Sequence, residues 1–415
     1  MRFIHLSDLH LGKSLYGISL IDHGDQGIWV DRFLQQAEAL SPDGVVIAGD
    51  IYDRSAPSGD AVTLFGRMVA RLEELGIPVL LVAGNHDSGQ RLSFAGEILA
   101  KQRVHIAGVL TEKLLSVTLP EKDGSGDVTF WLLPYVFPAQ VAQLLGDDSI
   151  RDYDTAVRRL LARQEIDFSR RNVLVAHQNV TADGREGVRG GSESMVGGVG
   201  QIDYRAFDGF DYVALGHIHA SYPVGRAEVR YAGSPLCYHF NETKQPPKGP
   251  LLVELGEKGT GVEITRLCVE PFYGMRELRG TYGEVLAAGE RETGDSYIRI
   301  VLTDQRVTAE TAQILRNLFE SRGSLVMELV SDYREYHAVR SGKDREAGEE
   351  KGVEEYFAEL YREKKDGAEP DGKDLELFRF AAGEVREAEA KGWKEEVDQS
   401  HVEKLLDFLL EQEAL

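Results

Sequence analysis

Residues 78–87 read PVLLVAGNHD, and their pattern is the clearest indication of the fold in this chain. The segment is apolar and of strand length as far as Ala83, and a polar cluster follows it at once. Residues 3–7 and 44–48 show the same arrangement of an apolar run before polar residues. The three runs are separated by two amphipathic segments that are predicted helices, residues 28–40 and 60–75. Their β-α-β-α-β order predicts an α/β fold, a sheet with helices packed against it.

The later predicted elements divide into two groups. The first contains strands at residues 173–176, 212–215, 229–231, 251–254 and 263–269. The second runs helix 282–288, strand 297–302, helix 309–320 and strand 324–329. This change in order predicts a large α/β domain over residues 1–270 and a small α+β domain over residues 271–335.

The last part of the chain differs from both. Residues 336–372 are rich in charge and poor in apolar residues, which is typical of a mobile linker or a solvated helix. Residues 373–415 contain two amphipathic helical patterns, the second preceded by a capping box of Ser400 and Glu403. Such helices either pack on their own chain or dock a partner protein, and the charged spacer before them favours a partner.

The composition is that of an ordinary globular protein. The chain has 415 residues, of which 42% are hydrophobic and 28% charged, and these values exclude low-complexity disorder and collagen-like repeats. No apolar run approaches the ~20 residues of a membrane-spanning helix, and the first residues lack the apolar core of a signal peptide. The two cysteines, Cys237 and Cys268, form no C-x-x-C pair, which favours the reducing cytoplasm.

The formal net charge of −22 argues against binding nucleic acid through bulk charge. Half of that excess lies in residues 341–415, where 12 basic and 23 acidic side chains give a net charge of −11. Local basic patches or bound metal cations can therefore still make part of the surface attractive to phosphate.

Five polar clusters follow predicted strands. They are Asp8-Leu9-His10, Gly49-Asp50, Gly84-Asn85-His86-Asp87, Ala176-His177 and Gly216-His217-Ile218-His219. Because sites in α/β proteins are built at the carboxyl ends of strands, we expect these clusters to meet. Their Asp, His and Asn side chains include no thiolate, so the donor set suits Mn²⁺, Mg²⁺, iron or Zn²⁺.

These side chains are sufficient for two metal ions. One ion could take Asp8, His10 and His219, and the other could take Asn85, His177 and His217. The carboxylate of Asp50 could bridge them at about 3.5–4 Å, the spacing of two-metal hydrolytic sites. Two such cations lower the pKa of a bridging water and hold the oxygens of a phosphate, which predicts attack by a bridging hydroxide at phosphorus.

Two residues of the third cluster have predicted catalytic roles. We expect His86 to point past the metal ions and to donate to a phosphate oxygen or act as general acid to the leaving group. Asp87 would then orient the loop or a histidine ring.

The five clusters, in this order, resemble the calcineurin-like metallophosphoesterase superfamily. The longer stretches SDLHLGKSLYG, GDIYDRSAPS, GNHDSGQRL, SESMVGGVGQIDYRAFDGFDYVALGHIH and YAGSPLCYHFNE are similar, more narrowly, to the SbcD family of DNA nuclease subunits. The resemblance implies a four-layered αββα sandwich, a dinuclear centre that prefers Mn²⁺ over Mg²⁺, and a small capping domain at residues 271–335. It also implies C-terminal helices that bind the coiled coil of an SMC-like ATPase of the SbcC type.

The same resemblance carries roles over residue by residue. It implies a transition-state role for His86 and metal-binding roles for Asp8, His10, Asp50, Asn85, His177, His217 and His219. After residue 271 the likeness rests on the order of elements alone.

Contacts to DNA are predicted less directly. Lys13, Arg54 and Arg91 follow the metal motifs by a few positions, so their loops should open on the same rim and neutralise phosphates there. For each of them a solvated charge or a salt bridge to a neighbouring acid is an equal alternative. The Gly-rich residues 184–200 could form a flexible loop on the DNA side or a packed connector.

We therefore expect a metal-dependent nuclease that cleaves duplex DNA ends and hairpins as a homodimer with its ATPase partner, in the cytoplasm at the nucleoid. The dimer surface should be apolar and lie near the early helices, although Phe65, Met68 and Leu72 could instead be core. A phosphatase or small-molecule phosphodiesterase on the same fold is the alternative. A scaffold with a vestigial metal site is disfavoured, because every expected ligand is present.

Overall fold

The computed structural model divides the chain into two compact units, residues 1–334 and residues 335–415. It describes residues 1–122, 124, 126–182, 184 and 200–333, with short stretches at 357–358, 361–362, 369–375 and 378–379. Most of the expected linker and C-terminal helices therefore lies outside the described residues. Within the second unit, the rings of Phe357 and Phe378 stack with their centroids 4.3 Å apart.

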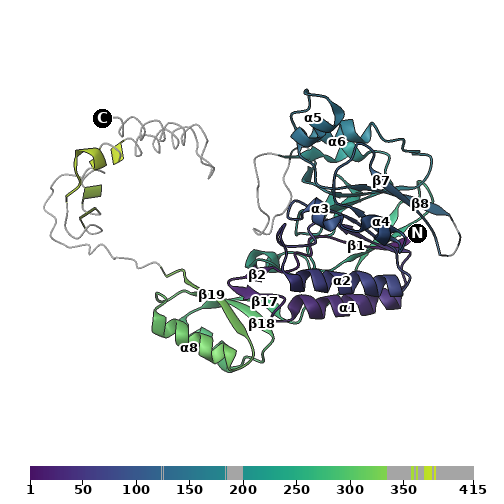
Figure 1. The fold of residues 1–415 in the computed structure, drawn as a ribbon. Helices are drawn as coiled ribbons and strands as arrows, with labels where there is room; N and C mark the ends of the chain where they lie inside the picture. Colours follow the sequence, from purple (N-terminus) through teal and green to yellow (C-terminus); the bar gives the residue numbers. More distant parts are fainter. Residues whose placement is uncertain are drawn as a thin grey trace, which may run out of the picture. The chain divides into compact units, whose positions relative to one another are not determined.

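The first sheet is built around four parallel strands. Its order is β16-β15-β1-β4-β5-β6, in which β1, β4, β5 and β6 run parallel and β15 and β16 extend the sheet antiparallel. The strands are β1 (Arg2–Leu6), β4 (Gly44–Ala48), β5 (Val79–Val82), β6 (Val104–Ala107), β15 (Leu251–Leu255) and β16 (Val262–Arg266). Helices α1 (Asp25–Leu40) and α2 (Gly59–Glu74) lie side by side along it (Figure 1).

The second sheet has the order β13-β14-β12-β9-β8-β7, with a parallel centre and antiparallel edges. Its strands are β7 (Leu115–Pro120), β8 (Asp127–Leu133), β9 (Asn172–His177), β12 (Tyr212–Gly216), β13 (Pro223–Val224) and β14 (Arg226–Tyr231). Helices α5 (Pro138–Leu145) and α6 (Tyr153–Leu161) cover its outer face.

The alternation of side chains along the central strands explains how the layers stack. In β4, Val46 belongs to a core between the two sheets, whereas its neighbour Val45 belongs to the core under α1 and α2. In β9, Val175 joins the core between the sheets and Leu174 the core under α5 and α6. Each such buried side chain contributes roughly 1.5–3 kcal/mol. The result is the four-layered αββα sandwich that the family resemblance implied.

A small three-stranded sheet follows. Parallel strands β17 (Gly274–Gly280), β18 (Ser296–Leu302) and β19 (Leu325–Ser331) carry helices α7 (Tyr282–Glu290) and α8 (Ala309–Glu320). Ile298 and Ile300 pack under these helices, whereas Tyr297 and Met327 belong to the core under α1 and α2. The hydroxyl of Tyr297 donates to the buried carboxylate of Asp25, at the start of α1. The small sheet is thus attached to the sandwich through α1.

The remaining elements are short. They are β2 (Ser14–Leu15), β3 (Ile18–Ser19), α3 (Gly89–Leu92), α4 (Gly96–Ala100), β10 (Val180–Thr181), β11 (Ile202–Asp203) and the 3₁₀ turns η1 (Tyr204–Phe207) and η2 (Phe240–Lys244). Among the described helices, none combines the length and the apolar character that crossing a membrane would require.

Candidate metal centre

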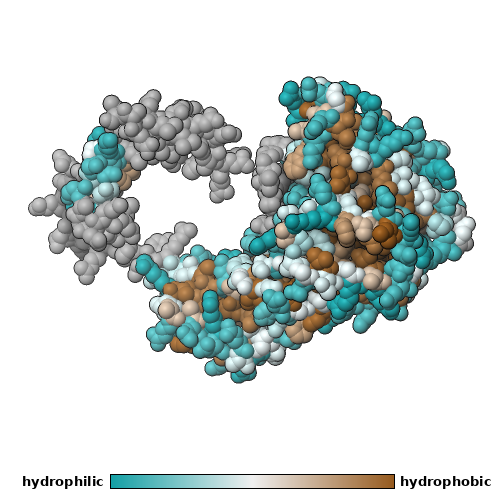
Figure 2. All heavy atoms as spheres, viewed as in Figure 1, coloured by the Kyte–Doolittle hydropathy of each residue, from teal (hydrophilic) through white to brown (hydrophobic). Residues whose placement is uncertain are grey.

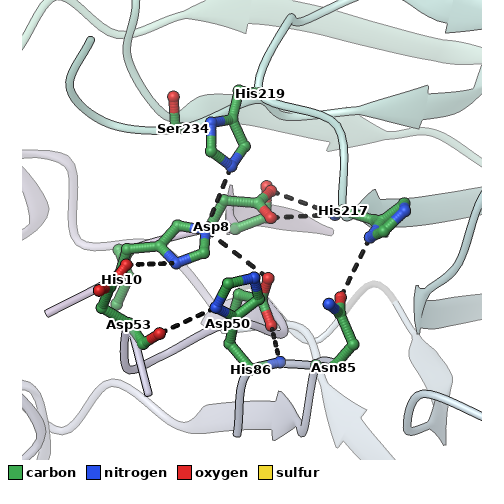
Figure 3. A network of polar contacts seen from close by, with 12 residues as sticks. Asp8, His10, Asp50, Asp53, Asn85, His86, His217, His219 and Ser234 are labelled. Atoms are coloured by element: carbon green, nitrogen blue, oxygen red, sulfur yellow. Dashed lines mark hydrogen bonds and ion pairs between the residues drawn. The ribbon is translucent and has the colours of Figure 1, made fainter. Parts of the chain in front are cut away.

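The five polar clusters meet where the carboxyl ends of strands from the two sheets lie close together, as expected. The first sheet supplies the residues that follow β1, β4 and β5, and the second supplies those at the ends of β9 and β12. Figure 3 shows most of these side chains converging: Asp8, His10, Asp50, Asn85, His86, His217 and His219.

Glycines in the motifs allow the two sheets to approach at this point. A Cβ atom on Gly216 would lie 1.8 Å from the carbonyl oxygen of Ala48, and one on Gly49 would lie 2.4 Å from Nδ1 of His177. A Cβ atom on Gly84 would lie 2.1 Å from Oδ1 of Asp50. Glycine is therefore required by space at these three positions, and at Gly49, where φ is 85°, by backbone conformation as well.

Four site residues have left-handed backbone conformations. The φ angles are 53° at Asp8, 42° at His10, 51° at Asp50 and 101° at His217. Such values are uncommon outside glycine and cost about 1–3 kcal/mol each unless neighbours enforce them. The amides of Asp8 and His10 donate to the carbonyls of Gly49 and Asp50, both at 3.0 Å, so adjacent loops hold each other in place.

Asp8, His10 and His219 form the first group of potential metal ligands. All three are buried, and their ligand atoms lie within 4.8 Å of one another. The Nε2 atoms of His10 and His219 face each other at 3.1 Å. Nδ1 of His219 donates to Glu242 at 3.3 Å, so Nε2 of the neutral ring carries a lone pair directed into the group.

Asn85, His177 and His217 form the second group. Oδ1 of Asn85 lies 3.1 Å from Nε2 of His177 and 3.1 Å from Nδ1 of His217. Oδ2 of Asp50 lies 3.3 Å from Nε2 of His177 and 3.6 Å from Nε2 of His10, so this carboxylate reaches both groups. Asp8 also clusters with Asp50 and His177, and its carboxylate accepts from the amide of His217 at 3.0 Å.

These donor atoms fit divalent cations. Nδ1 of His177 donates to the carbonyl of Ala48 at 2.7 Å, so Nε2 of the neutral ring is an acceptor. It faces two further acceptors, on Asn85 and Asp50, and buried acceptors this close repel unless a proton or a metal ion lies between them. Burial alone would lower the pKa of His177, but the Asp50 carboxylate outweighs burial and raises that pKa to about 9. Without a metal ion, a proton on Nε2 of His177 therefore occupies the position between these acceptors that a cation would take.

His86 lies at the edge of the first group. Its amide donates to Oδ1 of Asp50 at 2.9 Å, and its ring lies edge-on to that of His10 with centroids 4.8 Å apart. Nδ1 donates to the carbonyl of Asp53 at 2.8 Å, which fixes the tautomer and leaves Nε2 for a substrate or a proton. His86 also forms a group of potential metal ligands with His10 and Asp50, so its expected role beside the metal ions stays a prediction.

Asp87 connects loops. Its carboxylate accepts from the amides of Ile51 at 3.1 Å, Tyr52 at 3.0 Å and Gly84 at 2.9 Å. Burial raises the pKa of Asp87 to about 6, and the nearby Asp50 carboxylate adds to that effect. Among the described residues, the groups of potential metal ligands do not include Asp87, so its contacts are those of a residue that joins the loops after β4 and β5.

The three cations that could meet DNA have different surroundings. Nζ of Lys13 pairs with Oδ1 of Asp53 at 2.8 Å, and its side chain is only 15% exposed, which corresponds to the salt-bridge alternative. The side chain of Arg54 is 79% exposed, but its Nε lies 3.8 Å from Oδ2 of Asp53, so it too has a salt-bridge partner. Arg91 is exposed and donates to the carbonyl of Ser55 at 2.9 Å. Most of the Gly-rich segment, residues 185–199, lies outside the described residues.

Three residues around the centre were not singled out from the sequence: Asp53, Glu242 and Lys248. The carboxylate of Glu242 pairs with His219 and, at 2.8 Å, with Nζ of Lys248. Burial alone would raise the pKa of Glu242, but His219 and Lys248 hold it well below its usual range. Glu242 does lie inside the stretch YAGSPLCYHFNE, yet no spacing rule connects it with a histidine 23 positions earlier.

Comparison with known proteins places the chain in a family. Residues 1–221 match the model of the calcineurin-like phosphoesterases, and residues 271–365 match a model described as the type 5 capsule protein repressor C-terminal domain. A protein of Staphylococcus saprophyticus subsp. saprophyticus, named as the SbcD component of the nuclease SbcCD, is 33% identical over 291 residues, which are 69% of this chain and 73% of the relative. The chain belongs to the SbcD family of calcineurin-like phosphoesterases. This SbcD-family phosphoesterase is accordingly a metal-dependent hydrolase, and groups of potential ligands for divalent ions lie around Asp8 and Asp50.

Proposed function

We propose that this SbcD-family phosphoesterase is a DNA nuclease that uses two divalent ions, Mn²⁺ in preference to Mg²⁺, at the two ligand groups. The observation that carries the proposal is the position of Asp50 between Nε2 of His10 and Nε2 of His177, which makes one carboxylate common to both groups. DNA as the substrate is supported by the name of the relative, a component of a nuclease. Cleavage of DNA ends would place the protein at the nucleoid.

The residues have distinct tasks in this reaction. When bound, the ions supply Lewis acidity toward the phosphate and make a water nucleophilic at neutral pH. Nδ1 of His86 donates a hydrogen bond to the carbonyl of Asp53. A proton carried by the other ring nitrogen, Nε2, can therefore be donated to a phosphate oxygen or to the leaving group. Asp87 holds the backbone of Ile51 and Gly84, and thus keeps the ligands Asp50 and Asn85 in register.

The test is cleavage of a labelled linear duplex and a hairpin by the purified chain in Mn²⁺ and, separately, in Mg²⁺. An aryl phosphodiester is assayed beside them, and Asp50→Ala is the control for contaminating nucleases. Shortening of DNA that disappears in the control supports a nuclease. Hydrolysis of the ester without any cleavage of DNA would instead support the alternative, a small-molecule phosphodiesterase on the same fold.

A homodimer is part of this proposal. Phe65, Met68 and Leu72 are buried in the core, but Phe94 is 82% exposed and Ile98 is 66% exposed. These two side chains lie on α4 or just before it, and Phe94 borders a 590 Å³ groove between α2 and α4. Figure 2 shows an apolar area on the face where Figure 1 places α3 and α4. A second copy related by a twofold axis would cover this area with the same residues of its own chain.

The dimer is tested with Phe94→Glu. We expect the wild-type protein to elute at twice the mass of the chain and the variant at the mass of one chain, because a carboxylate cannot be buried in an apolar contact. Ile314→Glu, at an exposed apolar residue of α8, is the matched control and should stay dimeric. A wild-type protein that is monomeric at micromolar concentration contradicts the proposal.

The proposed ATPase partner rests on the sequence pattern of residues 373–415. If the last helix docks a coiled coil, deletion of residues 400–415 should weaken co-purification with an SbcC-type ATPase and leave cleavage of short DNA intact. Undiminished assembly after the deletion would remove this helix from the interface.

A further inference from the structure

We propose that Tyr135 and Phe137 form a stacking platform for an unpaired nucleobase beside the metal centre. The inference rests on the proposed nuclease function, and it adds the feature of the DNA, an unstacked base, that the site holds together with the phosphate.

Backbone geometry directs both rings to the same side. Residues 134–137 continue from β8 toward α5, and Phe137 is extended, with φ −108° and ψ 139°. Val136 is fully buried in the core under α5 and α6. Because side chains alternate along an extended chain, Tyr135 and Phe137 lie on the side opposite Val136, where the ring of Tyr135 also contacts that of Tyr153 on α6, with centroids 6.4 Å apart. The amide of Tyr135 donates to the carbonyl of Ala83 at 2.9 Å, which ties the segment to the end of β5.

The rings of Tyr135 and Phe137 lie next to the second ligand group, Tyr135 against its histidines and Phe137 against Tyr135. The ring of Tyr135 lies 6.1 Å, centroid to centroid, from His177 and the same distance from His217. Phe137 stands edge-on to Tyr135 at 5.0 Å and is 42% exposed. A phosphate held by the second group would therefore have an aromatic surface beside it, where the base of an adjoining nucleotide can stack.

Two arginines lie in or against the loop that holds His86. Arg54 follows Asp53, whose carbonyl holds His86, and Arg91 donates to Ser55 in the same loop. DNA would thus place its backbone along the arginines and a base on the aromatic side. A base inside a duplex cannot reach the platform while it is paired, whereas a base at a frayed end or in a hairpin loop can. The platform would therefore favour DNA ends and loops.

An exposed aromatic ring is not in itself a binding site, and Phe168 provides the comparison. It too is 42% exposed and lies edge-on to another ring, that of Phe210 at 5.5 Å. Phe168 precedes the first residue of β9, whereas His177 is the last residue of that strand. Unlike Phe168, Phe137 contacts a ring that adjoins two potential metal ligands.

The experiment measures kcat/KM for a short overhang substrate whose terminal nucleotides are replaced, one position at a time, by an abasic residue. Stacking on one aromatic side chain is worth roughly 5- to 150-fold per base. We expect the wild-type protein to lose about 10-fold or more at one position. Phe137→Ala should show no preference for the base at that position, Phe137→Trp should retain it, and Phe168→Ala should behave as the wild type.

A binding measurement separates this inference from the proposed function. In the His86→Ser protein with Mg²⁺, 2-aminopurine at the same DNA position should be quenched on binding, and Phe137→Ala should remove the quenching. If the wild-type protein cleaves base-bearing and abasic DNA equally, or if Phe137→Ala keeps the preference, the platform is wrong while the nuclease stands. If no DNA is cleaved but the quenching depends on Phe137, the proposed nuclease function is wrong and the proposed stacking platform is supported.

Discussion

Oε1 of Glu242 lies 3.3 Å from Nδ1 of His219, and the other carboxylate oxygen pairs with Nζ of Lys248 at 2.8 Å. Lys248 also donates to the backbone carbonyl of His219 at 2.6 Å. The carboxylate and the ammonium thus hold both the ring and the backbone of one potential metal ligand. Hydrogen bonds of this kind fix the tautomer of a ligating histidine and raise its basicity.

We therefore expect Glu242→Gln to weaken metal binding at the first group by about 10- to 100-fold, the usual effect of losing such a partner. The second group, around His177, should keep its affinity, because it does not contact Glu242. Titration with Mn²⁺ followed by electron paramagnetic resonance measures both sites. Glu254→Gln, at an exposed position on β15, is the control. If both sites of Glu242→Gln bind Mn²⁺ with wild-type affinity, the Glu242 carboxylate does not support metal binding and contributes only to packing.

Gly84→Ala should abolish metal binding. The added Cβ atom would lie 2.1 Å from Oδ1 of Asp50 and 2.4 Å from its backbone nitrogen, so the side chain and the loop would both have to move. Gly283→Ala, which places a Cβ atom in open space at the start of α7, should leave metal binding unchanged. Isothermal titration with Mn²⁺ compares the two variants. Wild-type affinity in Gly84→Ala would mean that the loop after β5 is adaptable.

The sequence was sufficient to predict which residues gather at the centre, because each cluster lies at the end of an apolar strand or within a few residues of it. It was not sufficient for Glu242, because a contact across 23 positions depends on how the η2 turn folds back on β12. Residues 115–161, with β7, β8, α5 and α6, were left without predicted elements, as was β17. β17 is half-buried along almost its whole length, so it shows no period of two. β7 does alternate, with Val117 and Leu119 buried between exposed residues, but it is short and was missed all the same. The left-handed backbone at Asp8 and His10 has no sequence signal, since neither residue is glycine.

Asp50→Ala should remove both metal ions together. Oδ2 of Asp50 lies within 3.6 Å of both His10 and His177, so its loss removes a donor from each group at once. Metal content measured after gel filtration should fall from two ions per chain to less than one. His105→Ala, at a half-buried histidine of β6 away from the centre, should retain both ions. Retention of one tightly held ion in Asp50→Ala would place this carboxylate in a single group.

His86→Ser should leave the metal content unchanged and reduce DNA cleavage by about 10²- to 10⁴-fold, the range of general acid–base catalysis. The amide of residue 86 still donates to Asp50 in the variant, so the loop should keep its position. Metal content and kcat are measured on the same preparation. Loss of an ion together with activity would instead make His86 a ligand, consistent with its proximity to His10 and Asp50.

Asp25 makes the attachment of the small sheet sensitive to pH. Its buried carboxylate accepts from the hydroxyl of Tyr297 and, at 3.4 Å, from the amide of Tyr273. Burial raises the pKa of Asp25 above its usual value, and these hydrogen bonds only partly oppose that effect. The folded protein thus binds this proton more tightly than the unfolded chain, so stability falls as pH rises from the unfolded pKa, about 3.9, through the folded pKa.

Asp25→Asn removes this titration while keeping an acceptor for Tyr297. The melting temperature of the variant, measured relative to that of the wild type, should therefore rise between about pH 4 and pH 7. Differential scanning calorimetry at several pH values provides the two curves, and their difference cancels the groups that both proteins share. A difference that stays constant or falls over this interval would show that the Asp25 carboxylate is as well stabilised in the fold as in water.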